Sequence, residues 1–134
     1  MTNPIRIFLV DDHPIVRSAL SSVFEDEPDL ELCGEAATAT DALEHALATR
    51  PDLVLVDVSL PDMSGIQLVR RLLEQNDDLR IAMLSGHAEK SHVQQSLQAR
   101  ALGYILKGNT DQLLEGIRAV ARGERYVSAE LRPD

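Results

Sequence analysis

The sequence contains little cysteine and few aromatic residues. Cys33 is the only cysteine among 134 residues, which excludes an intramolecular disulfide and a zinc site built from cysteines. Tryptophan is absent, and two tyrosines and two phenylalanines are the only aromatic residues. No apolar run approaches the roughly 18 residues of a transmembrane helix, and no basic segment followed by an apolar core opens the chain. We therefore expect a soluble, cytoplasmic protein with no membrane partner.

Basic residues are also scarce relative to acidic ones. The 13 Lys and Arg residues stand against 22 Asp and Glu residues, which gives a net charge of −9. Affinity for DNA depends on neutralising phosphates with Lys and Arg, so this balance argues against nucleic-acid binding by the chain itself. The length, with 44% hydrophobic and 26% charged residues, is typical of one globular domain with a single core.

The chain does contain a regular alternation of strand and helix patterns. Residues 53–57 are Leu and Val up to a final Asp57, and their two-sided apolar character is typical of a strand buried in a parallel sheet. Four further segments predict strands, one of which alternates as a half-buried edge strand does. These segments are residues 5–10, the alternating residues 30–36, residues 80–84 and residues 103–106.

Apolar residues recur at helical spacing in five segments between and after these strands. The segments are residues 14–27, 38–50, 66–73, 89–100 and 110–121. The fourth has a narrow apolar stripe centred on Val93 and Leu97, so we expect that helix to be weakly anchored. Five strands alternating with five helices predict an α/β fold, a doubly wound parallel sheet with helices on both faces.

Polar side chains stand where four of the predicted strands end. Because the carboxyl ends of parallel strands meet at one edge of the sheet, where such sheets bind ligands, we expect these side chains to gather there. They are Asp11, Asp12, Asp57, Ser85 and Lys107. Each alone has an ordinary explanation as a helix cap, a turn residue or a solvated loop lysine. Their joint occurrence in the right strand order favours a functional site.

The residue types indicate what this site binds. Asp11, Asp12 and Asp57 offer the oxygen ligands that a hard divalent cation prefers, and Mg²⁺ is the natural candidate because it needs only a few protein oxygens. Ser85 offers a hydroxyl donor and Lys107 a compact cation, which together suit a phosphoryl group. A carboxylate can attack phosphorus to form an acyl phosphate, while a metal and a lysine stabilise the charge on the equatorial oxygens.

Four segments make the chain closely similar to the receiver domain of bacterial two-component response regulators. They are residues 10–14, 56–65, 84–86 and 103–107, and the similarity extends over residues 5–122. The resemblance implies the flavodoxin-like receiver fold, with a five-stranded parallel sheet in the order 2-1-3-4-5 and five helices. It also implies a phosphorylation-dependent signalling switch that is not an enzyme acting on other molecules, because a receiver catalyses only its own phosphorylation and dephosphorylation.

The resemblance assigns chemical roles to the residues of the predicted edge. Asp57 accepts a phosphoryl group from a sensor histidine kinase or a small phosphodonor. Ser85 and Lys107 bind the phosphoryl oxygens. The Mg²⁺ ligands are Asp11, Asp12, Asp57 and the main-chain carbonyl of Ser59.

The resemblance also indicates residues that control the switch. Ser85 and Tyr104 form the switch pair that responds to the phosphoryl group, although a place in the core would also explain Tyr104. Ser59 and His87 flank the phosphoryl group and tune its hydrolysis. The chain departs from the pattern at Gly108, where many receivers have a proline, often after a cis bond. A cis bond without proline costs roughly 3–4 kcal/mol, so the geometry of the bond before Gly108 stays open.

Residues 117–131 resemble the NarL/FixJ (LuxR-type) subfamily. Its members usually continue into a helix-turn-helix domain that binds DNA and regulates transcription. We therefore expect a receiver domain at residues 1–122, and residues 123–134 as the start of a linker to an effector domain that this sequence does not include.

The subfamily also implies a phosphorylation-dependent homodimer. The dimer would form through the face of the fourth helix, fifth strand and fifth helix, or through the first and fifth helices. Candidate contacts that flank the core stripes are Ile15, Arg118 and Arg122.

Three other classes of protein share parts of this pattern. A flavodoxin-type electron carrier needs a Gly, Ser or Thr loop after the first strand to cradle a phosphate, which Asp11 and Asp12 would repel. An aspartate-based phosphohydrolase needs a second acid two residues after its nucleophile, where this chain has Ser59. A pseudo-receiver, a protein-interaction module not regulated by phosphorylation, stays open as the alternative. It would be expected to lose Asp57, Lys107 or the acid pair, and all are present.

Overall fold

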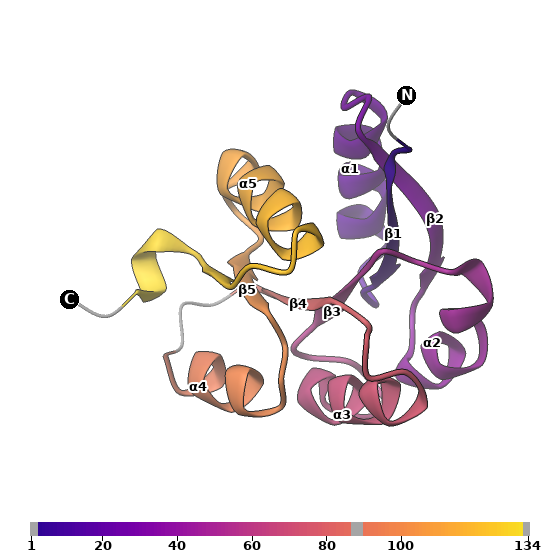
Figure 1. Ribbon diagram of the computed structural model, residues 1–134, viewed down its shortest axis with the longest axis vertical. Helices are drawn as coiled ribbons and strands as arrows, with labels where there is room; N and C mark the ends of the chain where they lie inside the picture. The colour runs from indigo at the N-terminus through magenta and orange to yellow at the C-terminus, as the bar shows by residue number, and fades with distance from the viewer. Residues whose placement is uncertain (1–2, 87–89, 133–134) are drawn as a thin grey trace.

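Six strands form one parallel sheet between two layers of helices (Figure 1). The computed structural model describes residues 3–86 and 90–132. The strand order is β2-β1-β3-β4-β5-β6, and every neighbouring pair is parallel. The strands are β1 (Ile5–Val10), β2 (Leu30–Ala36), β3 (Leu53–Asp57), β4 (Ile81–Ser85), β5 (Gly103–Leu106) and β6 (Tyr126–Val127). The α-helices are α1 (Pro14–Glu25), α2 (Ala39–His45), α3 (Gly65–Gln75), α4 (Lys90–Gln98) and α5 (Thr110–Ala121).

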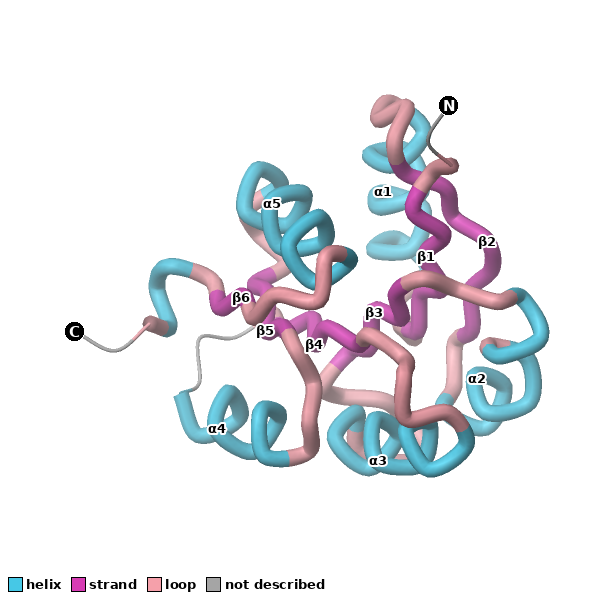
Figure 2. The backbone as a smooth tube through the Cα atoms, in the orientation of Figure 1, coloured by secondary structure: helices cyan, strands magenta, loops and turns pink. Residues whose placement is uncertain are grey.

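The sheet has a hydrophobic core on each face. Leu53 and Leu55 of β3 belong to the core covered by α1 and α5, whereas Val54 and Val56 belong to the core covered by α2, α3 and α4. Figure 2 shows the same division, with the strands between the two helix layers. All residues of β3 are buried. This two-sided burial explains why the sequence of β3 is an apolar run without alternation.

The structure confirms the parallel α/β fold with five α-helices and corrects the number of strands. The expected count of five strands in the order 2-1-3-4-5 is wrong, because β6 pairs with the outer edge of β5. This strand lies within the residues expected to begin a linker, and its Tyr126 is buried. A two-residue strand has no periodicity to detect, since only the tertiary neighbour β5 makes it a strand.

Two further local features concern the end of the second predicted helix and the peptide bond before Gly108. The predicted second helix divides into α2 and a 3₁₀ turn, η1 (Leu47–Thr49), which ends at Arg50 with a φ of +52°. Pro51 explains why the helix stops there, because the residue before a proline is disfavoured in the right-handed α conformation, and Arg50 adopts the left-handed one. The bond before Gly108 is trans, as no cis bond occurs in the described residues. No helix within those residues is long and apolar enough to cross a membrane.

The loop between β3 and α3 fixes the surroundings of Asp57. Ser64 caps α3 through a reciprocal pair of hydrogen bonds with Gln67. Gly65 follows, and a Cβ atom on it would lie 2.2 Å from the carbonyl oxygen of Asp57. Glycine is therefore required where the start of α3 meets the end of β3. Asp62, in the same loop, caps the first turn of α2 through its carboxylate.

Candidate functional site

The structure brings the five predicted polar residues to the C-terminal edge of the sheet. Asp57 ends β3, Ser85 ends β4, Asp11 and Asp12 follow β1, and Lys107 follows β5. The backbone N–H of Asp11 donates to a carbonyl of β2 at 3.1 Å, and that of Lys107 donates to the Ser85 carbonyl at 2.9 Å. Pairing of the sheet therefore continues one residue past both strands and fixes the positions from which these side chains extend.

Lys107 joins the two buried carboxylates of the site. Its Nζ lies 2.8 Å from Oδ2 of Asp11 and 3.1 Å from Oδ2 of Asp57. Asp11 is 0% exposed and Asp57 is 3% exposed. A buried carboxylate is costly unless it is paired and hydrogen-bonded, so Lys107 provides compensation that both residues need.

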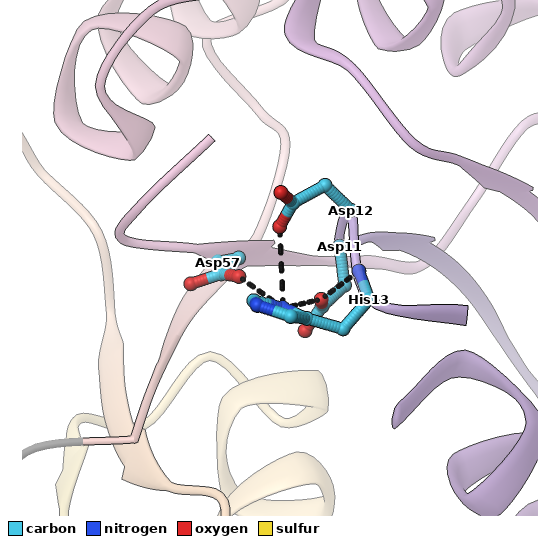
Figure 3. A group of neighbouring side chains, drawn as sticks. All are labelled: Asp11, Asp12, His13 and Asp57. Carbon is cyan, nitrogen blue, oxygen red and sulfur yellow. Dashed lines mark hydrogen bonds and ion pairs between the residues drawn. The ribbon is translucent and has the colours of Figure 1, made fainter. Parts of the chain in front are cut away.

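His13 also lies among the carboxylates, as Figure 3 shows. Its Nδ1 is 2.8 Å from Oδ1 of Asp11, 3.2 Å from Oδ1 of Asp12 and 3.6 Å from Oδ2 of Asp57. Its backbone N–H donates to the same Asp11 oxygen at 2.9 Å. His13 belongs to residues 10–14, one of the segments that carry the family resemblance, but the sequence analysis assigned it no role of its own in the site. Its position directly after two acids was the available signal that it belongs to the site.

The electrostatics of the site separate the two buried aspartates. Burial raises the pKa of Asp57, and the backbone N–H of Ser59 and the charge of Lys107 oppose this rise without cancelling it. Burial acts on Asp11 in the same direction, but hydrogen bonds from Lys107 and His13 hold its pKa below the usual value. Burial lowers the pKa of Lys107, yet its bonds to the aspartates leave it raised overall. The hydrogen bond to Asp11 raises the pKa of His13.

The acidic cluster has the composition of a cation site. Asp11, Asp12, His13 and Asp57 each offer one ligand atom, and these atoms all lie within 4.8 Å of one another. Three of the four donors are carboxylates, the ligand type that hard divalent cations prefer. The imidazole and the Lys107 ammonium lie where positive charge is favoured. The three carboxylates therefore fit a small, hard dication.

The other predicted residues lie around this cluster. Ser59 is exposed and donates its N–H to Oδ1 of Asp57 at 3.0 Å. Ser85 and Tyr104 are buried. Because Tyr104 pairs with Met83 and the strand register is parallel, Ser85 and Tyr104 face the same side of the sheet, the side covered by α4. His87 lies outside the described residues.

Comparison with known proteins agrees with this geometry. The response regulator receiver domain family matches residues 7–118. The chain belongs to this family. Among relatives of the receiver domain, the uncharacterized transcriptional regulatory protein YhcZ of Bacillus subtilis is 39% identical over 129 residues, which are 96% of this chain and 60% of YhcZ. Response regulator UvrY of Escherichia coli K12 is 34% identical over 95% of this chain and 59% of its own length.

Solved structures place the receiver domain near the LuxR type. A two-component response regulator of the LuxR family from Aurantimonas superposes with a TM-score of 0.92 at 32% identity, over 96% of this chain and 93% of that one. The receiver domain of Mycobacterium tuberculosis NarL gives 0.84 at 28% identity, over 92% of this chain and all of that one. These findings confirm the resemblance to NarL and LuxR regulators. The chain spans about 60% of the length of the two curated relatives above.

Proposed function

We propose that this receiver domain is a phosphorylation-controlled switch of a two-component system, with Asp57 as the phosphoacceptor. One Asp57 carboxylate oxygen attacks the phosphorus of a phosphohistidine or a small phosphodonor, and the bond from phosphorus to the leaving group breaks. The observation that supports Asp57 is its place at the end of β3, with Lys107 Nζ 3.1 Å from its Oδ2 and the acid pair beside it. Asp11 is also bound to Lys107, but it is fully buried.

Mg²⁺ is the proposed cofactor, with Asp11, Asp12, Asp57 and the Ser59 carbonyl as its protein ligands. The bound ion supplies positive charge to the phosphoryl oxygens. The carboxylates bind the cation, and His13 must withdraw its Nδ1 from them, because the imidazole competes for the same oxygens. Lys107 and the Ser85 hydroxyl then donate to the phosphoryl group.

The proposed partners follow from the same assignment. A sensor histidine kinase supplies the phosphoryl group, and the altered face of α4, β5 and α5 favours a homodimer, with Ser85 and Tyr104 as the switch pair. In a longer protein, residues beyond this receiver would bind DNA and regulate transcription in the cytoplasm. The pseudo-receiver alternative is less favoured because Lys107 lies at bonding distance from both Asp11 and Asp57, and Asp12 offers a ligand atom within 4.8 Å of theirs.

Intact-mass measurement after incubation with acetyl phosphate and Mg²⁺ tests the assignment. We expect the wild type to gain one phosphoryl group and Asp57→Asn to gain none, since the amide keeps the shape and removes the nucleophile. Asp77→Asn is the matched control, because this exposed aspartate lies before β4, at the opposite edge of the sheet, and should leave phosphorylation intact. Phosphorylation of Asp57→Asn would show that the acceptor is another residue. No phosphorylation of the wild type would favour the pseudo-receiver.

Sedimentation velocity with and without beryllofluoride and Mg²⁺ tests dimerisation. We expect the phosphoryl mimic to shift the domain toward a dimer, and substitutions at the exposed Ile15 or at Arg122 to weaken it if α1 and α5 form the interface. A monomer at high concentration in both conditions would contradict the dimer and leave only a conformational switch.

A further inference from the structure

The segment after α5 is an ordered part of the domain, which we call the C-terminal strap (residues 124–132). Its strand β6 pairs in parallel with β5, so that the N–H of Tyr126 donates to the Leu102 carbonyl at 3.0 Å. The N–H of Ser128 donates to the Tyr104 carbonyl, also at 3.0 Å. The strap therefore satisfies backbone groups on the outer edge of β5, as a sheet strand does.

Ser128 makes a second and closer connection to the site. Its hydroxyl accepts the N–H of Leu106 at 2.9 Å, and the residue is 0% exposed. Leu106 is the last residue of β5 and directly precedes Lys107. On the opposite side of the strand, the N–H of Lys107 donates to the Ser85 carbonyl. The end of β5 is thus held between a residue of the phosphoryl site and the buried hydroxyl of the strap.

The surface of the domain is shaped to receive the strap. Gly116 leaves a notch in α5, since a Cβ atom there would lie 2.8 Å from Cδ1 of Tyr126 and 2.7 Å from Cδ1 of Ile105. Glycine is a poor residue for a helix interior, so the notch has a packing reason. Tyr126 is 7% exposed, and Leu131 is 3% exposed within the core that also contains Tyr104. The position of the strap after β5 and α5 can be followed in Figure 2.

These contacts converge on the residues that the proposed switch must move. Lys107 lies between Asp11 and Asp57 while the strap is docked. A phosphoryl group on Asp57 places its oxygens beyond the present carboxylate, so Lys107 must shift to bind them. Lys107 directly follows Leu106, so any part of this shift that involves the Lys107 backbone acts on the end of β5 that Ser128 holds.

We propose that Ser128 is a positioning residue for Lys107, and that the strap docks on β5 more tightly in the unphosphorylated domain than in the phosphorylated one. This inference rests on the proposed function, because it requires a phosphoryl group at Asp57. Coupling between two sites is reciprocal. A phosphoryl mimic that weakens docking by a given factor must therefore bind more tightly, by the same factor, when docking is removed.

Hydrogen exchange of the wild-type chain, read by mass spectrometry with and without beryllofluoride and Mg²⁺, is the first test. Coupling of ordinary strength corresponds to factors of roughly 5 to 150, so we expect the strap amides to exchange at least about fivefold faster with the mimic. Peptides from β2, at the far edge of the sheet and outside both proposed dimer interfaces, serve as the internal reference. Binding of the mimic without faster exchange in the strap would overturn the coupling and leave the proposed function intact. No binding by the wild type would overturn both.

Affinity for beryllofluoride in two strap variants is the second test. Ser128→Ala removes the hydroxyl that holds Leu106 but leaves the pairing of β6 with β5, so it should raise the affinity by up to the factor by which the mimic accelerates exchange of the wild-type strap. Ala129→Ser changes the exposed neighbour and should leave the affinity unchanged. If Ser128 only stabilises the fold, Ser128→Ala would lower the stability without changing the affinity for beryllofluoride. That result would overturn the assignment. If Ser128→Ala does not fold, the exchange of the wild type alone decides.

Discussion

Helices α3 and α4 cover the same face of the sheet beside the proposed phosphoryl site, yet they are anchored very differently. α3 buries five residues and begins with a capping box. α4, among its described side chains from His92 to Gln98, buries only Val93 and Ser96. A groove of about 700 Å³ lies between the two helices, lined by Gln67 and Arg70 of α3 and by His92 and Gln95 of α4. We call α3 with the loop before it the α3 wall of this groove, which is firmly held, and we call α4 the α4 wall, which is loosely held.

The difference between the walls indicates where a conformational change can occur. Segments with few buried apolar contacts open at the lowest cost, whereas a well-packed helix resists displacement. The α3 wall carries the loop that approaches Asp57, and the α4 wall lies against the face that contains Tyr104. We therefore expect the α3 wall to keep the chemistry in place while the α4 wall responds to it.

The largest expected effect comes from truncating one buried side chain in each wall. Leu72 of α3 is 0% exposed, so Leu72→Ala should lower the free energy of unfolding by about 2–5 kcal/mol. Val93 of α4 is 8% exposed, and Val93→Ala removes only two carbons, which corresponds to about 1–2 kcal/mol. Urea denaturation of both variants measures the two losses. Equal losses would mean that the walls are equally anchored.

A glycine pair gives the next comparison. Gly65→Ala places a Cβ atom 2.2 Å from the Asp57 carbonyl oxygen, so the backbone must move, at a cost of about 1–3 kcal/mol. The same shift should slow phosphorylation from acetyl phosphate, since it displaces Asp57. Gly86→Ala, in the loop toward α4, meets no atom of the described residues within 4 Å and should change stability by less than about 0.5 kcal/mol. A similar response of both variants, in unfolding and in phosphorylation rate, would remove the distinction.

Much of this comparison could be predicted from the sequence. The narrow stripe of residues 89–100 predicted a weakly anchored helix, and the burial of α4 agrees with it. The parallel fold followed from apolar runs and helical spacing, because those patterns are local. β6 could not be predicted in this way, since two residues show no period and the pairing depends on the distant edge of β5.

The functional site could likewise be predicted from the sequence only in part. Strand ends predicted that Asp11, Asp57 and Lys107 would meet, because parallel pairing alone brings them to one edge. The place of His13 depends on its side-chain rotamer, and the place of Asp62 depends on the path of a loop. Neither a rotamer nor a loop path leaves a periodic pattern in the sequence. The carboxylate of Asp62 accepts hydrogen bonds at 2.9 Å from the N–H groups of Ala39 and Thr40 and at 2.7 Å from the Thr40 hydroxyl.

Asp62 allows a pH-dependent test of the firmly held wall. The Thr40 hydroxyl, followed by the N–H groups of the first turn of α2, lowers the pKa of Asp62 from 3.8 to about 2. The unfolded chain therefore binds more protons than the folded one between about pH 4 and pH 2, so this contribution is complete above that window and is lost as the pH falls through it. Unfolding of the wild type and Asp62→Asn should converge toward pH 2 and differ most above pH 4. Asp77→Asn, with an exposed aspartate, is the control, and a gap independent of pH would contradict the capping role.

The smallest effect concerns the lifetime of the phosphoryl group. Ser59 and Gln95 line the groove from opposite walls, but Ser59 also donates its N–H to Asp57. A hydroxyl at this position can orient or obstruct the water that attacks the acyl phosphate, so Ser59→Ala should change the decay rate by about two- to fivefold, equivalent to roughly 0.4–1 kcal/mol in the barrier. Gln95→Ala should leave the decay unchanged, because none of the described side chains of its wall is bonded to Asp57. Time courses of intact mass after removal of acetyl phosphate measure both rates. An unchanged decay in Ser59→Ala, with phosphorylation intact, would show that Ser59 has no kinetic role. An effect of Gln95→Ala alone would assign control of hydrolysis to the loosely held wall.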